Sequence, residues 1–400
     1  MNIRNIQTSS KDVRELIEEK ARAAMQEFVH AIFEQEVAAL AGLKHRRGRG
    51  NAGVYRCGSD PGSVLISGQR MEVRKPRVKR NGVEIVLKSY KTFRSKDLLH
   101  KKILSYMVAG VSTRDYGELL DELSGGLGLS KSSVSRAFQE SSKKALEDLR
   151  TRSLAGHKWC AVQMDAIYFG GRSVLVALGI DTVGRKTVLG LTEGSSESAV
   201  VCTDLLQNLI ARGLPADKPF LFIIDGGKGL RKAITDTFGS HFPVQRCTVH
   251  KARNIEAYIP DRTHREFRHR WMRFRAATCY DQATAELRTI KDWLSRISDD
   301  AVRSLEEAEA ELVTAHRYGA SRILRRTLCS TNCIESVFSR VRAVCRRVTH
   351  WKHSPSQIKR WAAVALLEVE QYAHVKGFSD VDAFLNNLHS KVLLSMPKAA

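Results

Sequence analysis

Apolar residues recur at helical spacing near the start of the chain, from Asp12 to Leu40. A repeat of three and four residues places such side chains on one face of a helix. Gly42 follows as a plausible stop, because glycine readily adopts the backbone conformation that ends a helix. The pattern predicts one long helix within residues 1–45. Its apolar stripe packs either on the rest of the chain or on a second copy of itself, and the pattern does not choose between them.

Residues 46–92 begin with a linker rich in glycine and arginine and then become rich in β-forming residues. The candidate strands are 64–68, 71–79 and 83–90. Pro76 has no N–H group to donate to a neighbouring strand, so we expect its strand to lie at the edge of a sheet. Cys57 has no partner at the Cys-x2-Cys spacing of a zinc site, which argues against zinc here.

Residues 93–150 alternate apolar helical segments with glycine-rich breaks. We expect helices over 98–108 and 113–123, and a third that opens at Ser130. This order resembles a helix-turn-helix, whose last helix enters the major groove through its first residues. The side chains that would reach DNA are those of Ser132, Ser133 and Arg136. The alternative is an ordinary three-helix packing module in which Ser130 caps the third helix.

The pattern changes from Lys158, where short apolar runs alternate with turns and two longer helical segments. The expected strands are 159–169, 173–180, 187–191, 220–224 and 244–247, and the expected helices are 196–212 and 229–238. The first three strands would form an antiparallel meander. The fourth would return parallel beside the first, through a helical crossover. This order looks like the ribonuclease H-like fold, an α/β architecture with a five-stranded mixed sheet.

Two aspartates occupy neighbouring strands in that arrangement. Asp165 lies within the first strand and Asp225 directly follows the fourth. Two carboxylates on adjacent strands can bind hard divalent cations. Asp225 precedes two glycines and could instead be a turn residue. Asp165 within an apolar strand is harder to explain structurally, because an unpaired buried carboxylate is costly.

Residues 251–319 read as consecutive helices that separate the fifth strand from a later segment, Ser330 to Ser336. There Asn332 would cap a helix that carries Glu335, and an apolar face would dock that helix on the sheet. The docking face consists of Ile334, Phe338, Val341 and Val344. Glu335 is the only acidic residue between 317 and 360, so it is either a metal ligand or the salt-bridge partner of neighbouring basic residues.

The formal net charge of +22 indicates a polyanionic partner. Residues 44–102 hold 17 Lys and Arg against 4 Asp and Glu, and residues 317–360 hold 11 against Glu335 alone. Clustered basic residues release counterions from DNA, so they are the expected footprint of DNA binding. In the first cluster our candidate contacts are Arg46, Arg47, Arg77 and Lys79. The alternative is that such clusters only keep the surface solvated.

Several classes of protein are disfavoured by the remaining composition. No stretch approaches 18 consecutive apolar residues, so we expect no membrane span. Residues 1–12 lack the apolar core of a secretory signal. The eight cysteines are scattered along the chain, which fits a reducing cytoplasm better than a disulfide framework. We therefore expect a cytoplasmic protein, and the family resemblance described next implies a bacterial one associated with the nucleoid.

Seven sequence tags in one order strongly resemble the Mutator-type transposases of bacterial insertion sequences. They are VQMDAIYF, ALGIDTVGRKTVLGL, SSES, ARGL, IIDGGKGL, QRCTVHKARN and TNCIES. The upstream helix and the RCGSDPGSV, VRKPRVK and GVSTRDY segments are also similar to that family, so the resemblance covers nearly the whole chain.

The resemblance implies a DDE transposase, in which two aspartates and a glutamate hold the catalytic metal ions. It maps that triad onto Asp165, Asp225 and Glu335. The ribonuclease H-like core would occupy 155–250 and 320–400, the latter including C-terminal helices, with an all-α insertion at 251–319. Residues 1–45 would form the N-terminal long helix, residues 46–92 a small, basic, β-rich segment that binds DNA, and residues 93–150 a helix-turn-helix-like domain.

The implied activity is cleavage at the 3′ ends of the element and transfer of those ends to target DNA. Two Mg2+ ions would be held by the triad, and Mn2+ should substitute because it also accepts oxygen ligands. The partners would be double-stranded DNA, as terminal inverted repeats and as target, and a second copy of the chain. The alternatives are a catalytically silent DNA-binding protein derived from a transposase and a nuclease that does not join strands.

Cys247 and His250 match the Cys-x2-His motif of the resembled family. Two ligands do not fill a tetrahedral zinc site, so we interpret the pair as structural or DNA-positioning in preference to a metal site. His250 at a helix start could contact phosphate. Arg340 and Arg342 follow Glu335, and Arg342 lies two helical turns beyond it on the same face. Arg342 is a candidate contact to the DNA end, or simply one basic residue among many.

Overall fold

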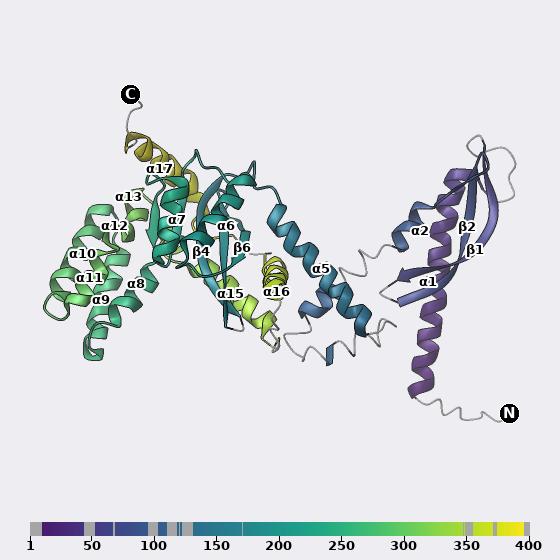
Figure 1. Ribbon diagram of the computed structural model, residues 1–400, viewed down its shortest axis with the longest axis horizontal. Helices are drawn as coiled ribbons and strands as arrows, with labels where there is room; N and C mark the ends of the chain where they lie inside the picture. Colours follow the sequence, from purple (N-terminus) through teal and green to yellow (C-terminus); the bar gives the residue numbers. More distant parts are fainter. Residues whose placement is uncertain are drawn as a thin grey trace, which may run out of the picture. The chain divides into compact units, whose positions relative to one another are not determined.

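A computed structural model describes residues 10–43, 53–66, 69–94, 103–109, 118–119, 121, 131–169, 171–346, 348, 355–370 and 374–395 (Figure 1). The chain divides into two compact units. One comprises residues 1–107 and 116–141, and the other comprises 108–115 and 142–400. Each unit is described by itself below.

In the first unit a long helix packs on a small antiparallel sheet. Helix α1 (Ser10–Ala41) is followed by β1 (Val54–Ile66), β2 (Gln69–Arg80), β3 (Val83–Ile85) and the short helix α2 (Lys88–Phe93). Val29, Phe33 and Val37 of α1 are fully buried against valines of the sheet. The C-terminal half of the predicted apolar stripe therefore packs on this chain's own sheet.

Two expectations for this unit were wrong. The sheet order is β1-β2-β3, so Pro76 lies in the central strand and not in an edge strand. Proline is tolerated there because β3 pairs only with Val78 to Arg80, which leaves the β3 side of Pro76 outside the ladder. The expected strand 83–90 ends at Ile85, and its last residues start α2. Glu36 of α1 stabilises that helix start by accepting hydrogen bonds from the Lys88 and Ser89 N–H groups.

The third helix of the expected helix-turn-helix is α5 (Lys131–Thr151). Residues 103–109 are helical, as expected for the first helix, whereas residues 122–130, which include Ser130 and the glycine-rich turn, lie outside the described residues. The helix-turn-helix thus stays a prediction.

The second unit is built on a five-stranded mixed sheet. Its strands are β4 (Trp159–Phe169), β5 (Arg172–Asp181), β6 (Lys186–Glu193), β7 (Leu221–Ile224) and β8 (Val244–Arg246). Their order is β6-β5-β4-β7-β8. The first three strands are antiparallel, and β4-β7 and β7-β8 are parallel. The predicted meander and the parallel return beside the first strand are confirmed.

Helices cover both faces of this sheet (Figure 1). On one face α6 (Ala199–Ala211) and α7 (Lys228–Phe238) pack over Val162, Met164 and Ile224. On the other face, α14 (Arg322–Leu328) and α17 (Val381–Ser395) pack over Ala161 and Ile223. Because both faces are covered, the strands are apolar almost throughout, and the polar residues within them stand out.

A helical segment separates β8 from the C-terminal part of the unit and forms its own core (Figure 1). It comprises α8 (Thr248–Glu256), α9 (Asp261–Ala276), α10 (Tyr280–Leu294), α11 (Asp299–Glu306), α12 (Glu309–Leu312) and α13 (Thr314–Arg317). The chain then continues through α14, α15 (Asn332–Cys345), α16 (Pro355–Glu368), a 3-10 turn (Phe378–Asp380) and α17. Among the described residues, no helix has both the length and the apolar content needed to cross a lipid bilayer.

Candidate active site

Asp165 and Asp225 come from neighbouring parallel strands. Met164 of β4 is in register with Ile224 of β7, so the residue that follows each of them is an aspartate at the same level of the sheet. Strand alternation turns both aspartates toward the face that carries Ala161 and Ile223. Asp225 also accepts a hydrogen bond from the Gly227 N–H at 3.2 Å. Asp225 therefore acts as a turn residue and also lies beside Asp165.

Asp165 lies in an environment that opposes its charge. Burial raises its pKa to about 6, and the charges of Asp225 and Glu335 add to that effect. A hydrogen bond from the Ala166 N–H and the nearby His250 act in the opposite direction. The charges of Asp225 and Glu335 thus both oppose ionisation of Asp165, and a bound cation would relieve that repulsion.

Glu335 lies near enough to Asp165 for its charge to act on that carboxyl, and its helix α15 is anchored to β4. Gln163, two residues before Asp165, is fully buried. Its side-chain oxygen accepts from the Ile334 N–H at 3.0 Å, and its amide nitrogen donates to the Ser330 carbonyl at 3.0 Å. The start of the helix that carries Glu335 is therefore fixed to the strand that carries Asp165.

The helix α15 begins one residue earlier than expected. Thr331 occupies the cap position and Asn332 is the first helical residue, so the expected Asn332 cap was wrong. The Thr331 hydroxyl instead donates to Glu335 Oε1 at 2.8 Å, which orients the carboxylate. The expected docking face is correct for Ile334, Phe338 and Val341, whereas Val344 is only half-buried.

Cys247 and His250 join this group from the end of β8. The ligand atoms of Cys247, His250 and Glu335 lie within 4.8 Å of one another, and His250 Nε2 is 3.6 Å from Glu335 Oε1. The hydrogen bond with Cys247 raises the pKa of His250 to about 9, supported by the charges of Asp165 and Glu335. Burial acts to raise the pKa of Cys247, but hydrogen bonds from His250 and Thr331 outweigh it and lower that pKa.

The chemistry of the donors distinguishes two ways in which a metal could be held. Asp165, Asp225 and Glu335 offer carboxylate oxygens, which suit Mg2+ and Mn2+. Cys247, His250 and Glu335 offer a sulfur, a nitrogen and an oxygen, a set closer to zinc. The carboxylates fit a hard cation, because burial and then the charges of Asp225 and Glu335 raise the pKa of Asp165, and a bound cation would oppose both effects.

The expected DNA contacts are spread over both units. In α5, Ser132 and Arg136 are exposed in the first turns, while the side chain of Ser133 lies outside the described set. Arg340 and Arg342 are exposed on α15.

The residues expected from the basic N-terminal cluster have different surroundings. Arg77 forms ion pairs with Asp60 and Glu84, both at 3.3 Å. Lys79 is half-buried. Arg46 and Arg47 lie in a part of the chain that the structure does not describe. Arg77 is thus already neutralised by carboxylates of its own unit, which reduces its availability to phosphate.

Gln163 and Thr331 were missed by the sequence analysis. Gln163 carried a signal, since it is a polar residue two positions from Asp165 in an otherwise apolar strand, and i and i+2 share one face. Nothing in the sequence indicated a role for Thr331, apart from its position just before the predicted helix. Its hydroxyl lies 3.4 Å from both Cys247 Sγ and His250 Nδ1, and only the folded chain brings these groups together.

Known proteins of similar sequence are transposases of insertion sequences. A family model described as "Transposase, Mutator family" matches residues 2–374. The chain is 28% identical over 331 residues to the transposase of insertion sequence element IS1201 from Lactobacillus helveticus, which covers 80% of this chain and 86% of the relative. It is 27% identical over 397 residues to the transposase of ISRM5 from Rhizobium meliloti, covering 95% and 94%. It is 30% identical over 263 residues to the IS256 transposase of Tn4001 from Staphylococcus aureus, covering 62% and 64%.

Proposed function

Because the chain belongs to the Mutator family of transposases, we propose that it is a DDE transposase that cuts the 3′ ends of an insertion sequence and joins them to target DNA. Asp165, Asp225 and Glu335 form the metal-binding triad. The observation that carries this proposal is that Asp165 and Asp225 follow paired residues of the parallel strands β4 and β7, while Gln163 of β4 holds the start of the helix that carries Glu335.

The sheet order supports a ribonuclease H-like core. In the order β6-β5-β4-β7-β8, the strand that carries Asp165 is central, and the crossover through α6 returns β7 beside it. Ligands of open α/β sheets bind at the carboxyl ends of parallel strands. Asp225 lies at the carboxyl end of β7, and Glu335 arrives there from α15 after the helical insertion.

In the mechanism, the triad's carboxylates would hold two Mg2+ ions, which activate the attacking hydroxyl and stabilise the leaving 3′ oxygen when bound. Asp165 and Asp225 present oxygens from rigid strands, which keeps the reacting groups in line. Glu335 is oriented by the Thr331 hydroxyl and lies beside His250. Terminal inverted repeats and target DNA are the substrates, and a dimer of this chain would hold two DNA ends together.

The test is a cleavage and joining assay with labelled element ends, a target duplex and Mg2+. Asp165→Asn, Asp225→Asn and Glu335→Gln should each abolish cut and joined products while binding of the ends persists. Asp217→Asn, which removes an exposed carboxylate from a loop, is the matched control and should react like the wild type. EDTA should stop the reaction, and Mn2+ should restore it.

The product pattern distinguishes the alternatives. Joined product supports the transposase, and cut product without joining identifies a nuclease. Binding with neither product identifies a catalytically silent DNA-binding protein. Full cleavage by any of the three triad variants would contradict the assignment of the triad.

A further inference from the structure

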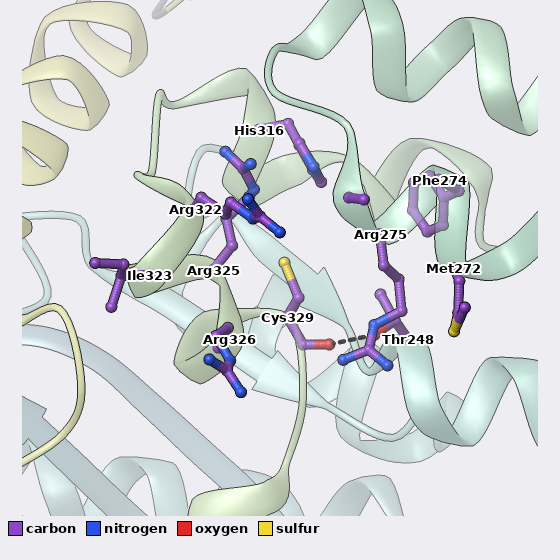
Figure 2. A pocket seen from close by; sticks show the side chains of 11 residues that line it. Thr248, Met272, Phe274, Arg275, His316, Arg322, Ile323, Arg325, Arg326 and Cys329 are labelled. Carbon is purple, nitrogen blue, oxygen red and sulfur yellow. Dashed lines mark hydrogen bonds between the residues drawn. The ribbon is translucent and has the colours of Figure 1, made fainter.

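A cavity of about 660 Å³ lies beside the candidate active site, lined by residues of α8, α9, α13 and α14 (Figure 2). None of the triad residues lines it. Four arginines do, namely Arg275, Arg322, Arg325 and Arg326. Aspartate and glutamate are absent from the lining, so the cavity presents positive charge without a carboxylate to balance it.

The least exposed of these arginines is Arg325, at 6%. Its guanidinium donates to the Ala320 carbonyl at 2.6 Å and to the Ala277 carbonyl at 2.7 Å, while its Nε atom is buried without a hydrogen-bond partner. Within the described ranges no carboxylate forms an ion pair with any of the four arginines. A buried charge without a counterion is costly, so this arrangement favours an anion from outside the chain.

A second polar group, which lies near the backbone of Ala277, lines the cavity and is buried. His316 is 5% exposed, and neither of its ring nitrogens makes a hydrogen bond of normal geometry to a described residue. Burial and the charge of Arg325 lower the pKa of His316 to about 4, so the ring is neutral near pH 7. Buried polar side chains normally find partners. A neutral imidazole offers one donor and one acceptor to a polar ligand.

The rest of the lining is apolar. Phe274 and Cys329 are buried, whereas Met272 and Ile323 are 63% and 55% exposed. Figure 2 shows these side chains around the same space as the arginines. An apolar wall beside guanidinium groups suits a ligand that has both a flat, weakly polar part and an anionic part.

The cavity is joined to the triad through its backbone. The Cys329 carbonyl accepts from both the N–H and the hydroxyl of Thr248, each at 2.9 Å (Figure 2). Thr248 follows Cys247, and Thr331, which orients Glu335, lies two residues after Cys329. The wall of the cavity and the residue that orients Glu335 thus belong to the same backbone segment, Cys329 to Thr331.

We propose that this cavity binds one unpaired nucleotide of the DNA strand, with its phosphate on the arginines and its base against the apolar wall and His316. The proposal rests on the function proposed above. A nucleotide within a duplex keeps its base stacked, so only an unpaired or extruded one can place the base in a cavity. The substrate would thus be opened next to the position of cleavage.

The experiment is photocrosslinking of the full chain in EDTA, so that no reaction is needed. The probe is an eight-residue thymidine oligonucleotide that carries one 5-iodouracil, and crosslinked peptides are identified by mass spectrometry. Crosslinks should appear within 272–276, 316 or 322–329. The same oligonucleotide annealed into a duplex should give at least about tenfold fewer crosslinks there. Its bases would no longer contact the cavity, and such contacts raise affinity by about that factor.

Variants separate the two parts of the nucleotide. Arg322→Ala/Arg326→Ala removes two exposed guanidinium groups and should reduce crosslinking at these peptides about tenfold. Met272→Ala/Ile323→Ala removes exposed apolar contacts and should reduce crosslinking of the iodouracil oligonucleotide at these peptides. An octamer of the same length without bases should compete for the cavity equally well in this variant and in the wild type. Arg262→Ala/Arg265→Ala, which removes two exposed arginines from the start of α9, is the matched control and should leave these crosslinks unaffected.

Crosslinks that map only outside the cavity, or that are unchanged in the Arg322→Ala/Arg326→Ala variant, would overturn the proposal. Equal crosslinking by the duplex would contradict the need for an unpaired nucleotide. If DNA ends are cut and joined while the cavity stays unlabelled, this inference alone fails. If the oligonucleotide crosslinks to the cavity peptides but no DNA is cut in the cleavage assay, the proposed transposase mechanism is wrong and the proposed nucleotide site is supported.

Discussion

At the scale of single residues, a buried ionisable group marks each of the two candidate sites. The pKa of Asp165 is raised by burial and by like charges, and Arg325 is buried without a carboxylate. Each is costly for folding, and each would be relieved by a ligand of opposite charge. By contrast, Arg77 is paired with Asp60 and Glu84 and needs no ligand for charge balance.

His316 should make stability depend on pH. Burial lowers its folded pKa from 6.5 to about 4, so the unfolded chain takes up a proton first as the pH falls. Above pH 6.5 the imidazole is neutral in both the folded and the unfolded chain, so its burial does not change the free energy of unfolding with pH. As the pH falls from 6.5 to about 4, protonation of the unfolded chain lowers that free energy. Between pH 7 and pH 5 the wild type should lose about 2 kcal/mol more than His316→Leu does.

The measurement is urea unfolding at both pH values. His269→Gln, which removes an exposed histidine from α9, is the control and should keep the pH dependence of the wild type. A His316→Leu variant with an unchanged pH dependence would show that His316 does not carry this effect.

At the scale of elements, two buried glutamines fasten helices to the central sheet. Gln163 ties β4 to the start of α15. Gln245 of β8 donates to the Leu312 carbonyl at 3.0 Å and accepts from the Ala315 N–H at 2.8 Å, which ties the sheet to α12 and α13. The two anchors are chemically alike, but only Gln163 fixes a helix that carries a triad residue.

Gln163→Met should therefore affect stability and cleavage differently. It leaves the Ile334 N–H and the Ser330 carbonyl without partners, at a cost of about 3 kcal/mol. Small displacements of Glu335 should lower the cleavage rate on the order of a hundredfold, while binding of DNA ends persists. Denaturant unfolding and single-turnover cleavage measure the two effects.

Gln245→Met is the matched control for this positioning role. It should lose similar stability and keep a cleavage rate close to the wild type, measured well below the unfolding transition. If both variants lose cleavage in proportion to their stability, Gln163 is only a structural residue.

At the scale of the whole second unit, a buried ion network docks the helical insertion on the sheet. Arg246 and Lys251 have side chains that are 5% and 4% exposed. Arg246 pairs with Glu307 at 3.0 Å and with Glu311 at 2.9 Å, and Lys251 pairs with Glu307 at 2.7 Å. Because these contacts link β8 and α8 to α11 and α12, the insertion is held in a fixed place beside the triad.

Removing one carboxylate from this network should destabilise the unit. Glu311→Gln leaves Arg246 underpaired in a buried place and should cost about 3 kcal/mol. Glu306→Gln breaks the more exposed pair with Lys291 and should cost under about 1 kcal/mol. Thermal and urea unfolding compare the two variants, and equal losses would mean that the network does not dock the insertion.

The net charge of +22 predicts the salt dependence of DNA binding for the whole chain. If six to ten phosphates are neutralised, affinity should fall about 10³- to 10⁵-fold between 50 and 200 mM salt. Fluorescence anisotropy with a labelled duplex measures the slope. A flat salt profile would contradict the interpretation of the basic clusters as DNA contacts.

The sequence determined the strands of the second unit and their order, because apolar runs that are buried on both faces interrupt an otherwise polar pattern. From that order it also placed Asp165 beside Asp225. In the first unit it misjudged Pro76 and the start of α2, because the extent of β3 and the contact of Glu36 with Lys88 and Ser89 depend on pairing across the fold.

Only the tertiary structure decided where Glu335 and the four cavity arginines lie. Glu335 is 110 residues from Asp225 in the sequence. Its position depends on the hydrogen bonds that Gln163 makes with the start of α15. From the sequence, Arg322, Arg325 and Arg326 were only members of the basic segment 317–360, for which we predicted DNA binding in general. Whether a charge is paired is set by neighbours from distant segments, here α9 and α13, and that information exists only once the chain has folded.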